Sequence, residues 1–356
     1  MKSRKDFEIN NVILERILKF INEYQLIKSG DRIVLGVSGG PDSIFMLDTL
    51  RKLKENKKLN CELIVAHVNH MIREEAIDDE QYVVEYCKKN NIECYAKRID
   101  VQKYANNNKV GTEEAGRILR YQFFDEILKN TNSQKIAIAH NKNDKAETII
   151  MNLLRGSGLT GLKGIEPIRN NKYIRPILGM ERNEIEEYCE YNSLNPRIDK
   201  TNFENTYTRN KIRNIIIPYI KQEFNPNIID AMDRLSQVVT EEESFLEEIT
   251  KNELNKIIVN KNNSEIILDL KKFNGLNKVI QKRIVFDSMS QVLGNSAGIE
   301  KIHIDDVVKL CNSNVGNKFT MPNKNIKVLI KDKKIFFTLV NEKNKFWKFL
   351  NFFESP

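Results

Sequence analysis

The sequence predicts an α/β fold, with a doubly wound parallel sheet covered by helices, followed by a second, helix-rich domain. Three observations support this prediction. Short apolar runs alternate with amphipathic helical patterns over the first part of the 356-residue chain. A glycine-rich turn directly follows the first apolar run. The alternation stops after about residue 216, where a long helical pattern begins.

The elements of the first domain follow from the spacing of apolar residues. A helix is expected over 9–27, because apolar residues recur there at helical intervals. The short apolar runs predict strands at 32–37, 61–68, 92–99, 135–140 and 173–179. The patterns between them predict helices at 43–56, 76–91, 112–130 and 144–155. Right-handed crossovers then bring the loops after the strands to one edge of the sheet, where α/β proteins bind ligands.

The remainder of the chain has a different pattern. It predicts a long helix at 224–257, a strand at 264–270, a helix at 276–293 and a two-stranded ribbon at 327–340. We therefore expect a catalytic domain at 1–215, a helix-rich domain at 216–340 and a tail at 341–356. Residues 318–348 hold nine lysines and two acidic residues, which is typical either of a solvated surface or of nucleic-acid contact.

Composition narrows the class of protein. The formal net charge is +8 and the sequence pI about 9.0, so an anionic partner such as nucleic acid is expected. The five cysteines form no C-x-x-C pair, which favours reduced thiols over disulfides or a metal cluster. No apolar run reaches about 18 residues and the charged N-terminus lacks a signal-peptide core. We expect a cytoplasmic protein without membrane association.

The turn after the first strand has the sequence Ser-Gly-Gly-Pro-Asp-Ser. Its glycines allow backbone N–H groups to face an anion, and the following helix adds partial positive charge. It lacks the lysine that contacts the β- and γ-phosphates in P-loops, but such a loop can hold pyrophosphate without it. Asp42 would repel a bare phosphate and is expected beside a nucleotide-bound Mg²⁺. The predicted ATP-binding residues are Ser38, Gly39, Gly40, Pro41, Asp42, Ser43 and, at the end of the second strand, Asn69.

A second polar group precedes and enters the fourth predicted helix. His140, Asp144 and Glu147 are spaced i, i+4 and i+7, which puts them on one face of a helix. Such a group can hold Mg²⁺ or bind and deprotonate an amine. The alternative is structural: Asn143 or Asp144 caps the helix, with Glu147 three residues later. With Asp42, these three residues are the predicted catalytic group.

Several stretches together identify a family. The 38–43 hexapeptide resembles the pyrophosphate loop of the N-type ATP pyrophosphatases, the PP-loop superfamily, whose fold is adenine nucleotide α-hydrolase-like. "AHVNHMIREE" (66–75), "EAGRILRY" (114–121), the 140–165 stretch, "RPIL" (175–178) and "DKTNFENTYTRNKIR" (199–213) narrow the resemblance. Together they are similar to the tRNA(Ile)-lysidine synthetase family over about residues 30–220.

The resemblance implies a ligase that forms a carbon–nitrogen bond in tRNA modification. The family uses ATP to join free L-lysine to C2 of the wobble cytidine in the CAU anticodon of tRNA(Ile). The reaction passes through an adenylated cytidine and releases AMP and pyrophosphate. The implied cofactors are ATP and Mg²⁺, with Asp42 as the metal ligand, and a homodimer is compatible with the family.

Basic and acidic residues elsewhere are assigned to tRNA or lysine binding, and the 216–340 domain is also expected to contact tRNA. Two arginines on one helix can clamp a phosphate or a base edge, and phosphate contacts position RNA without reading its sequence. For each set the alternative is an exposed ion pair or a solvated helix face. The glycine-rich stretch 156–164 is a loop that closes over the substrates in the family, or else an ordinary connection. The predicted tRNA- and lysine-binding residues are Glu114, Arg117, Arg120, Arg155, Arg209 and Arg213.

Departures from the family pattern and rival functions complete the interpretation. The family usually has histidine at position 141 and aspartate at position 143, whereas this chain has asparagine at both. The site therefore has one carboxylate fewer than the family pattern, while Asp144 keeps its spacing. A PP-loop cytidine thiolase would need paired cysteines. A non-catalytic RNA-binding protein on a decayed nucleotide fold is the alternative from another class.

Overall fold

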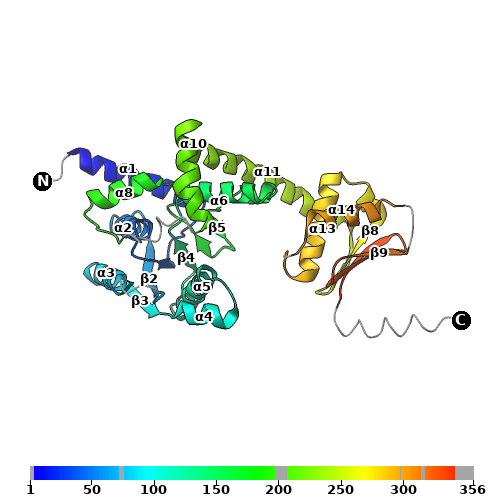
Figure 1. Cartoon of the computed structure of the whole chain (residues 1–356), viewed down its shortest axis with the longest axis horizontal. Coiled ribbons are helices and arrows are strands. Elements are labelled where there is room, and N and C mark those ends of the chain that lie inside the picture. Colours follow the sequence, from blue (N-terminus) through cyan, green and yellow to red (C-terminus); the bar gives the residue numbers. More distant parts are fainter. Residues whose placement is uncertain (1–3, 72–75, 198–206, 297, 314–316, 341–356) are drawn as a thin grey trace. The chain divides into compact units, whose positions relative to one another are not determined.

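The computed structural model describes residues 4–71, 76–197, 207–296, 298–313 and 317–340 (Figure 1). The chain forms two compact units, Met1–Val239 and Thr240–Pro356. The predicted tail and the 199–206 part of the last family motif lie outside the described residues. None of the described helices is both long and apolar enough to cross a membrane.

The first unit is built on a six-stranded, mostly parallel sheet with the order β3-β2-β1-β4-β6-β5. β1 pairs in parallel with both β2 and β4, and only β5 runs antiparallel, against β6. The predicted parallel α/β sheet is therefore confirmed. The strands are β1 (Asp31–Gly36), β2 (Cys61–Asn69), β3 (Glu93–Arg98), β4 (Lys135–Ile138), β5 (Ile168–Arg169) and β6 (Tyr173–Ile174).

Helices cover both faces of this sheet, as the alternation of side chains along β1 requires. Ile33 and Leu35 pack in one core with α1, α2, α3 and α8, whereas Val34 packs in a second core with α5. The helices are α1 (Arg4–Glu23), α2 (Pro41–Glu55), α3 (Ala76–Lys89), α4 (Val101–Asn108), α5 (Thr112–Asn130), α6 (Lys142–Leu154), α7 (Leu159–Leu162), α8 (Arg182–Tyr191), α9 (Thr208–Lys211), the π-helical turn η2 (Ile212–Ile216) and α10 (Ile217–Glu223).

The strand order places the candidate site. From β1 the chain moves to β2 and β3 on one side, and then returns across the sheet to β4 on the other side of β1. The loops that follow β1 and β4 therefore lie next to each other where the order reverses, which is the ligand position in open α/β sheets. These two loops contain the predicted ATP-binding turn and the His140 group.

The second unit corrects the prediction of a helix-rich domain. Its described part contains a five-stranded antiparallel sheet of order β7-β8-β11-β10-β9 as well as helices (Figure 1). The strands are β7 (Ile258–Lys261), β8 (Glu265–Asp269), β9 (Lys318–Asn323), β10 (Ile326–Lys331) and β11 (Lys334–Leu339). The helices are α11 (Ile228–Ile257), which begins in the first unit, α12 (Leu270–Asn274), α13 (Lys278–Leu293) and α14 (Lys301–Cys311).

The sequence missed β7 and β9 for physical reasons. β7 continues directly from the 30-residue helix α11 and has little apolar pattern of its own. β9 contains a proline and sits at the sheet edge, where proline is tolerated. The predicted boundary at residue 215 and the assignment of 216–340 to tRNA contact stay predictions.

Candidate functional site

The glycine-rich turn has a backbone shape that depends on its glycines. Gly39 has φ +93°, a left-handed conformation that other residues rarely adopt. A Cβ atom on Gly36, the last residue of β1, would lie 2.6 Å from the ring of Phe124. Gly40 is the N-cap of α2, and Pro41 occupies its first turn. The chain can thus pass tightly from strand to helix at this point.

Two serines hold the turn together. The Ser43 hydroxyl donates to the carbonyl of Gly40 at 2.9 Å and accepts from the backbone N–H of Ser38 at 3.1 Å. The Ser43 hydroxyl is therefore engaged within the turn, and α2 has no side-chain cap. The first N–H groups of a helix have no intrahelical acceptors, so this uncapped end suits an anion.

Asp42 lies in the first turn of α2 and faces the start of α6. Asn141 donates its side-chain amide to Asp42 Oδ1 at 2.8 Å. Burial, with the neighbouring charge of Asp144, raises the pKa of Asp42 to about 6. Asp42 is therefore mostly ionised at neutral pH, but in surroundings that disfavour its charge, so the site favours an added cation that would stabilise the ionised form.

The start of α6 departs from the predicted pattern at His140. The helix begins at Lys142, so His140 precedes it and does not share a helix face with Asp144. Asn141 is the N-cap: its side chain accepts from Asp144 N–H at 2.9 Å, and Asp144 accepts from Asn141 N–H at 3.0 Å. The capping alternative was thus correct in kind but placed the cap at Asn143 or Asp144 rather than at Asn141.

Two predicted carboxylates and two predicted arginines meet in one cluster. Arg209 reaches Asp144 Oδ1 at 3.0 Å and Glu147 Oε2 at 2.9 Å. Arg213 reaches Asp144 Oδ1 at 2.9 Å and also pairs with Glu147, whose side chain is only 2% exposed. Burial alone raises the pKa of Asp144, but nearby positive charges, chiefly that of Arg209, outweigh it and lower that pKa. The cluster joins α6 to α9 and the turn η2.

His140 is held as a neutral imidazole. Arg175, which is 4% exposed, donates from Nε to His140 Nδ1 at 3.0 Å. A donor on Nδ1 places the ring proton on Nε2. Burial lowers the pKa of His140 to about 4, although Asp144 opposes this shift and Arg175 supports it. Sequence reasoning assigned no role to Arg175, and its only signal was the "RPIL" motif.

Asn69 lies at the end of β2, as predicted, but its side chain is engaged within the chain. Its amide donates to the carbonyl of Ala76 and to Glu80 Oε2, both at 2.9 Å, and its Oδ1 accepts from Met71 N–H at 2.9 Å. These bonds use both amide hydrogens. A nucleotide contact from Asn69 would therefore use its carbonyl oxygen, and the prediction stays untested.

The predicted residues of α5 lie at its exposed surface. Glu114 and Arg117 are exposed, and the Arg117 guanidinium lies 5.7 Å from the ring centre of Tyr121. The Arg117 charge contributes to the lowered pKa of His140, so it is close enough to act on the site electrostatically. Arg120 contacts His70 at 3.2 Å. These positions are open to a polyanion.

The glycine-rich segment after α6 folds back onto that helix. The side-chain amide of Asn152 donates to the carbonyl of Gly161 at 2.8 Å. Gly164 has φ +66°, and a Cβ atom there would lie 2.8 Å from Ile149 Cγ1. Arg155, at the beginning of the segment, is exposed. The segment thus has a defined docked arrangement, and its closure over substrates stays a prediction.

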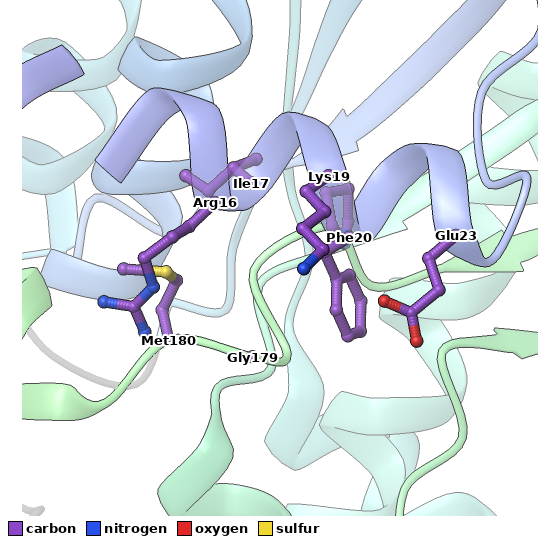
Figure 2. Close-up of a pocket in the computed structure, with 8 residues that line it drawn as sticks. Arg16, Ile17, Lys19, Phe20, Glu23, Gly179 and Met180 are labelled. Carbon is purple, nitrogen blue, oxygen red and sulfur yellow. The ribbon is translucent and has the colours of Figure 1, made fainter. Parts of the chain in front are cut away.

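A shallow pocket lies between α1 and residues 176–180 (Figure 2). Its volume is about 260 Å³, and none of the predicted site residues lines it. Small-molecule sites usually measure roughly 300–1,000 Å³. Arg16, one of the lining residues, is paired with Glu184. We assign this pocket no part in the site.

The carboxylates of the site differ in their ability to bind a metal ion. Among the described residues, no group of three or more His, Cys, Asp or Glu side chains could hold an ion by itself. Asp144 is occupied by Asn141 and the arginines, whereas Asp42 has one recorded hydrogen bond, from Asn141. Mg²⁺ commonly takes one or two carboxylates, with phosphate oxygens and water completing its shell. Asp42 fits that role.

Comparison with known proteins agrees with this geometry. Residues 9–220 match the PP-loop domain family. The chain is 43% identical over 341 residues to a tRNA(Ile)-lysidine synthase of Clostridioides difficile (strain 630), a match that covers 94% of the chain and 73% of the relative. A tRNA(Ile)-lysidine synthase of Geobacillus kaustophilus (strain HTA426) is 34% identical over 304 residues, with 84% and 65% covered. The fold also resembles the U34-tRNA thiolase NcsA of Methanococcus maripaludis, with TM-score 0.53, 18% identity and 65% and 80% covered.

Proposed function

Because the chain belongs to the tRNA(Ile)-lysidine synthase family of PP-loop proteins, we propose how its residues divide the work of this ATP-dependent ligation. The family membership makes the chain a ligase with tRNA(Ile), lysine and ATP as substrates. The chain spans 73% and 67% of the length of two of these relatives.

The turn at 38–43 binds the β- and γ-phosphates of ATP. The observation that carries this assignment is the uncapped start of α2 behind the left-handed Gly39, with Ser43 bracing the loop. Pyrophosphate held there is the leaving group, so the α-phosphorus faces the C2 oxygen of the wobble cytidine. The cytidine is then adenylated, and the lysine ε-amine attacks C2 and displaces AMP.

Asp42 serves at the phosphate end of the site. Its raised pKa and its recorded bond from Asn141 suit a carboxylate that holds Mg²⁺ together with phosphate oxygens. Bound Mg²⁺ would offset the negative charge that develops on the departing pyrophosphate. Asn141 keeps the Asp42 carboxylate oriented, because its amide also caps the neighbouring helix α6.

The arginine–carboxylate cluster prepares the lysine site. In the structure, Arg209 and Arg213 neutralise Asp144 and Glu147, so the lowered pKa of Asp144 makes it a weak base. Phosphates of ATP or tRNA compete for the two guanidinium groups. When the arginines turn toward phosphate, the freed carboxylates bind the lysine ammonium and accept its proton.

Neutral His140 has a different role from the one its spacing suggested. With its proton on Nε2, it can donate a hydrogen bond but cannot act as a cation near neutral pH. We assign it to positioning a substrate oxygen beside Asp144. The exposed residues Glu114, Arg117, Arg120 and Arg155 are assigned to tRNA or lysine. A cytoplasmic location and a homodimer complete the proposal.

Mass spectrometry of the anticodon nucleosides tests this function. The chain is incubated with tRNA(Ile) carrying a CAU anticodon, ATP, Mg²⁺ and L-lysine, and the tRNA is then digested. A lysine adduct on the wobble cytidine is expected, and it should be absent when lysine or ATP is omitted. A tRNA that is bound but carries no adduct would instead favour the non-catalytic alternative.

A further inference from the structure

Among the described residues of the second unit, no helix covers one of the two faces of its sheet. α13 and α14 pack against the other face (Figure 1). Side chains alternate between the two faces of a strand. The strand residues that are buried under the helical layer are Ile266, Leu268, Ile326, Val328, Ile330, Ile335 and Phe337.

The uncovered face carries a row of apolar side chains. In the sheet register Phe319 pairs with Leu329, Leu329 with Phe336, and Phe336 with Ile267, so the row crosses β9, β10, β11 and β8. Phe319 is 56% exposed and the other three are partly buried. None of the four belongs to the core beneath the helices. Exposed faces of antiparallel sheets are usually polar, so this row indicates an interaction site.

Lysines surround the row. Lys327 Nζ lies 4.3 Å from the centre of the Phe319 ring. Lys331 and Lys334 lie opposite each other on β10 and β11, at the far end of the same face. Within 265–269 and 318–339 there are six lysines and three acidic residues. Two of those acids are engaged: Glu265 accepts from Thr338, and Asp269 caps α12. Both carboxylates keep their charge, but six lysines against three acids leave these strands and turns with a net charge of +3, so the row of apolar side chains lies in a positively charged region.

We propose that this aromatic sheet face, defined by Phe319, Leu329, Phe336 and Ile267 with Lys327, binds an unpaired nucleotide of the RNA substrate. A base can stack on the exposed Phe319 ring while lysines contact the flanking phosphates. Antiparallel sheets with exposed aromatic side chains bind single-stranded RNA in the same way in other folds. An apolar protein partner would gain nothing from the lysines. The inference rests on tRNA being the substrate and adds where it is held.

The test is tRNA binding by the full chain without ATP, measured across a series of salt concentrations. Phe319→Ala should weaken binding roughly 5- to 100-fold, because stacking on an aromatic ring contributes that much per base, and should leave the salt dependence unchanged. Lys327→Gln and Lys331→Gln should each reduce the slope of log affinity against log salt by about 1. Phe319→Leu, which keeps an apolar side chain without the ring, should resemble Phe319→Ala.

Two controls separate this site from general surface effects. Val279→Ala alters an exposed side chain on α13, in the helical layer of the same unit, and should leave tRNA affinity unchanged. At saturating tRNA, Phe319→Ala should form the lysine adduct at the parental rate, with a raised KM for tRNA alone.

If wild type binds tRNA but forms no adduct, the proposed function fails while this inference stands.

Two results would overturn the inference. The first is unchanged tRNA affinity in Phe319→Ala and in Phe336→Leu, a variant that keeps the sheet apolar. The second is a change of oligomeric state in these variants, measured by sedimentation, that accounts for any loss of affinity. In that case the row would be an interface between copies of the chain.

Discussion

Asp42→Asn should separate stability from activity. The variant keeps the shape of the side chain and an oxygen that can accept from Asn141, but it removes the charge. Asp42 is partly buried beside Asp144, and this surrounding raises its pKa from 3.8 to about 6. The folded chain disfavours the negative charge of Asp42, and that charge is required only when the nucleotide and its metal are bound. We therefore expect a more stable protein that no longer forms the lysine adduct.

The size and sign of the effect follow from the pKa. A group with a raised folded pKa contributes stability that is fully present below its unfolded pKa and is lost as pH rises through its folded pKa. Each pKa unit corresponds to about 1.4 kcal/mol, so the change from 3.8 to about 6 amounts to at most about 3 kcal/mol. Asp42→Asn should therefore match wild type near pH 3, below the unfolded pKa of 3.8, and exceed it by up to that amount at pH 8.

Urea unfolding at several pH values measures this difference. Asp48→Asn is the matched control, because Asp48 is a buried carboxylate on the same helix. Asp48 is paired with Arg51 and Lys52. Burial alone would raise its pKa, but these partners outweigh burial and lower it. Its loss should instead destabilise the protein increasingly as pH rises above its folded pKa. A stability gap between Asp42→Asn and wild type that does not depend on pH would refute the reasoning.

Three further substitutions probe the same site. Asn141→Asp removes the amide donor to Asp42 and adds a carboxylate, so the acid limb of the pH–rate profile should move to higher pH. Ser43→Ala removes the brace of the turn and should raise the KM for ATP about fivefold in steady-state kinetics, since a hydrogen bond contributes roughly 1 kcal/mol. Arg213→Gln leaves buried Glu147 with fewer partners and should lower the free energy of unfolding by roughly 2–3 kcal/mol in urea.

Each of these expectations has a contrary result. An unshifted acid limb in Asn141→Asp would mean that Asp42 does not control that limb. A Ser43→Ala enzyme with parental KM for ATP would remove the brace from ATP binding. Parental stability in Arg213→Gln would show that Arg209 alone satisfies Glu147.

Much of the first unit was predictable because its signals are local. Strands buried on both faces appear as short apolar runs, and α5 was predicted with the bounds that the structure has, 112–130. The second unit was harder, because β7 and β9 join a sheet through pairing with distant strands and carry weak patterns of their own. Edge and terminal strands depend on such tertiary pairing, which spacing alone does not encode.

The site shows the same division. The turn at 38–43 was found because its chemistry is contiguous. The pairing of Asp144 with Arg209 joins residues 65 positions apart, and both were predicted but not as partners. His140 was misassigned to a helix because the cap at Asn141 comes one residue after it. Arg175 lies in the "RPIL" motif, but its role was not predictable because it depends on a neighbour 35 positions away.

The most direct test of the central claim follows a label in the α-phosphate of ATP during the reaction with tRNA(Ile) and lysine. If the 38–43 turn holds the β- and γ-phosphates of ATP, the label should appear in AMP, in an amount equal to the lysine adduct. Pyrophosphate should be the second product. Labelled ADP with free phosphate would contradict the account, because cleavage would then lie between the β- and γ-phosphates.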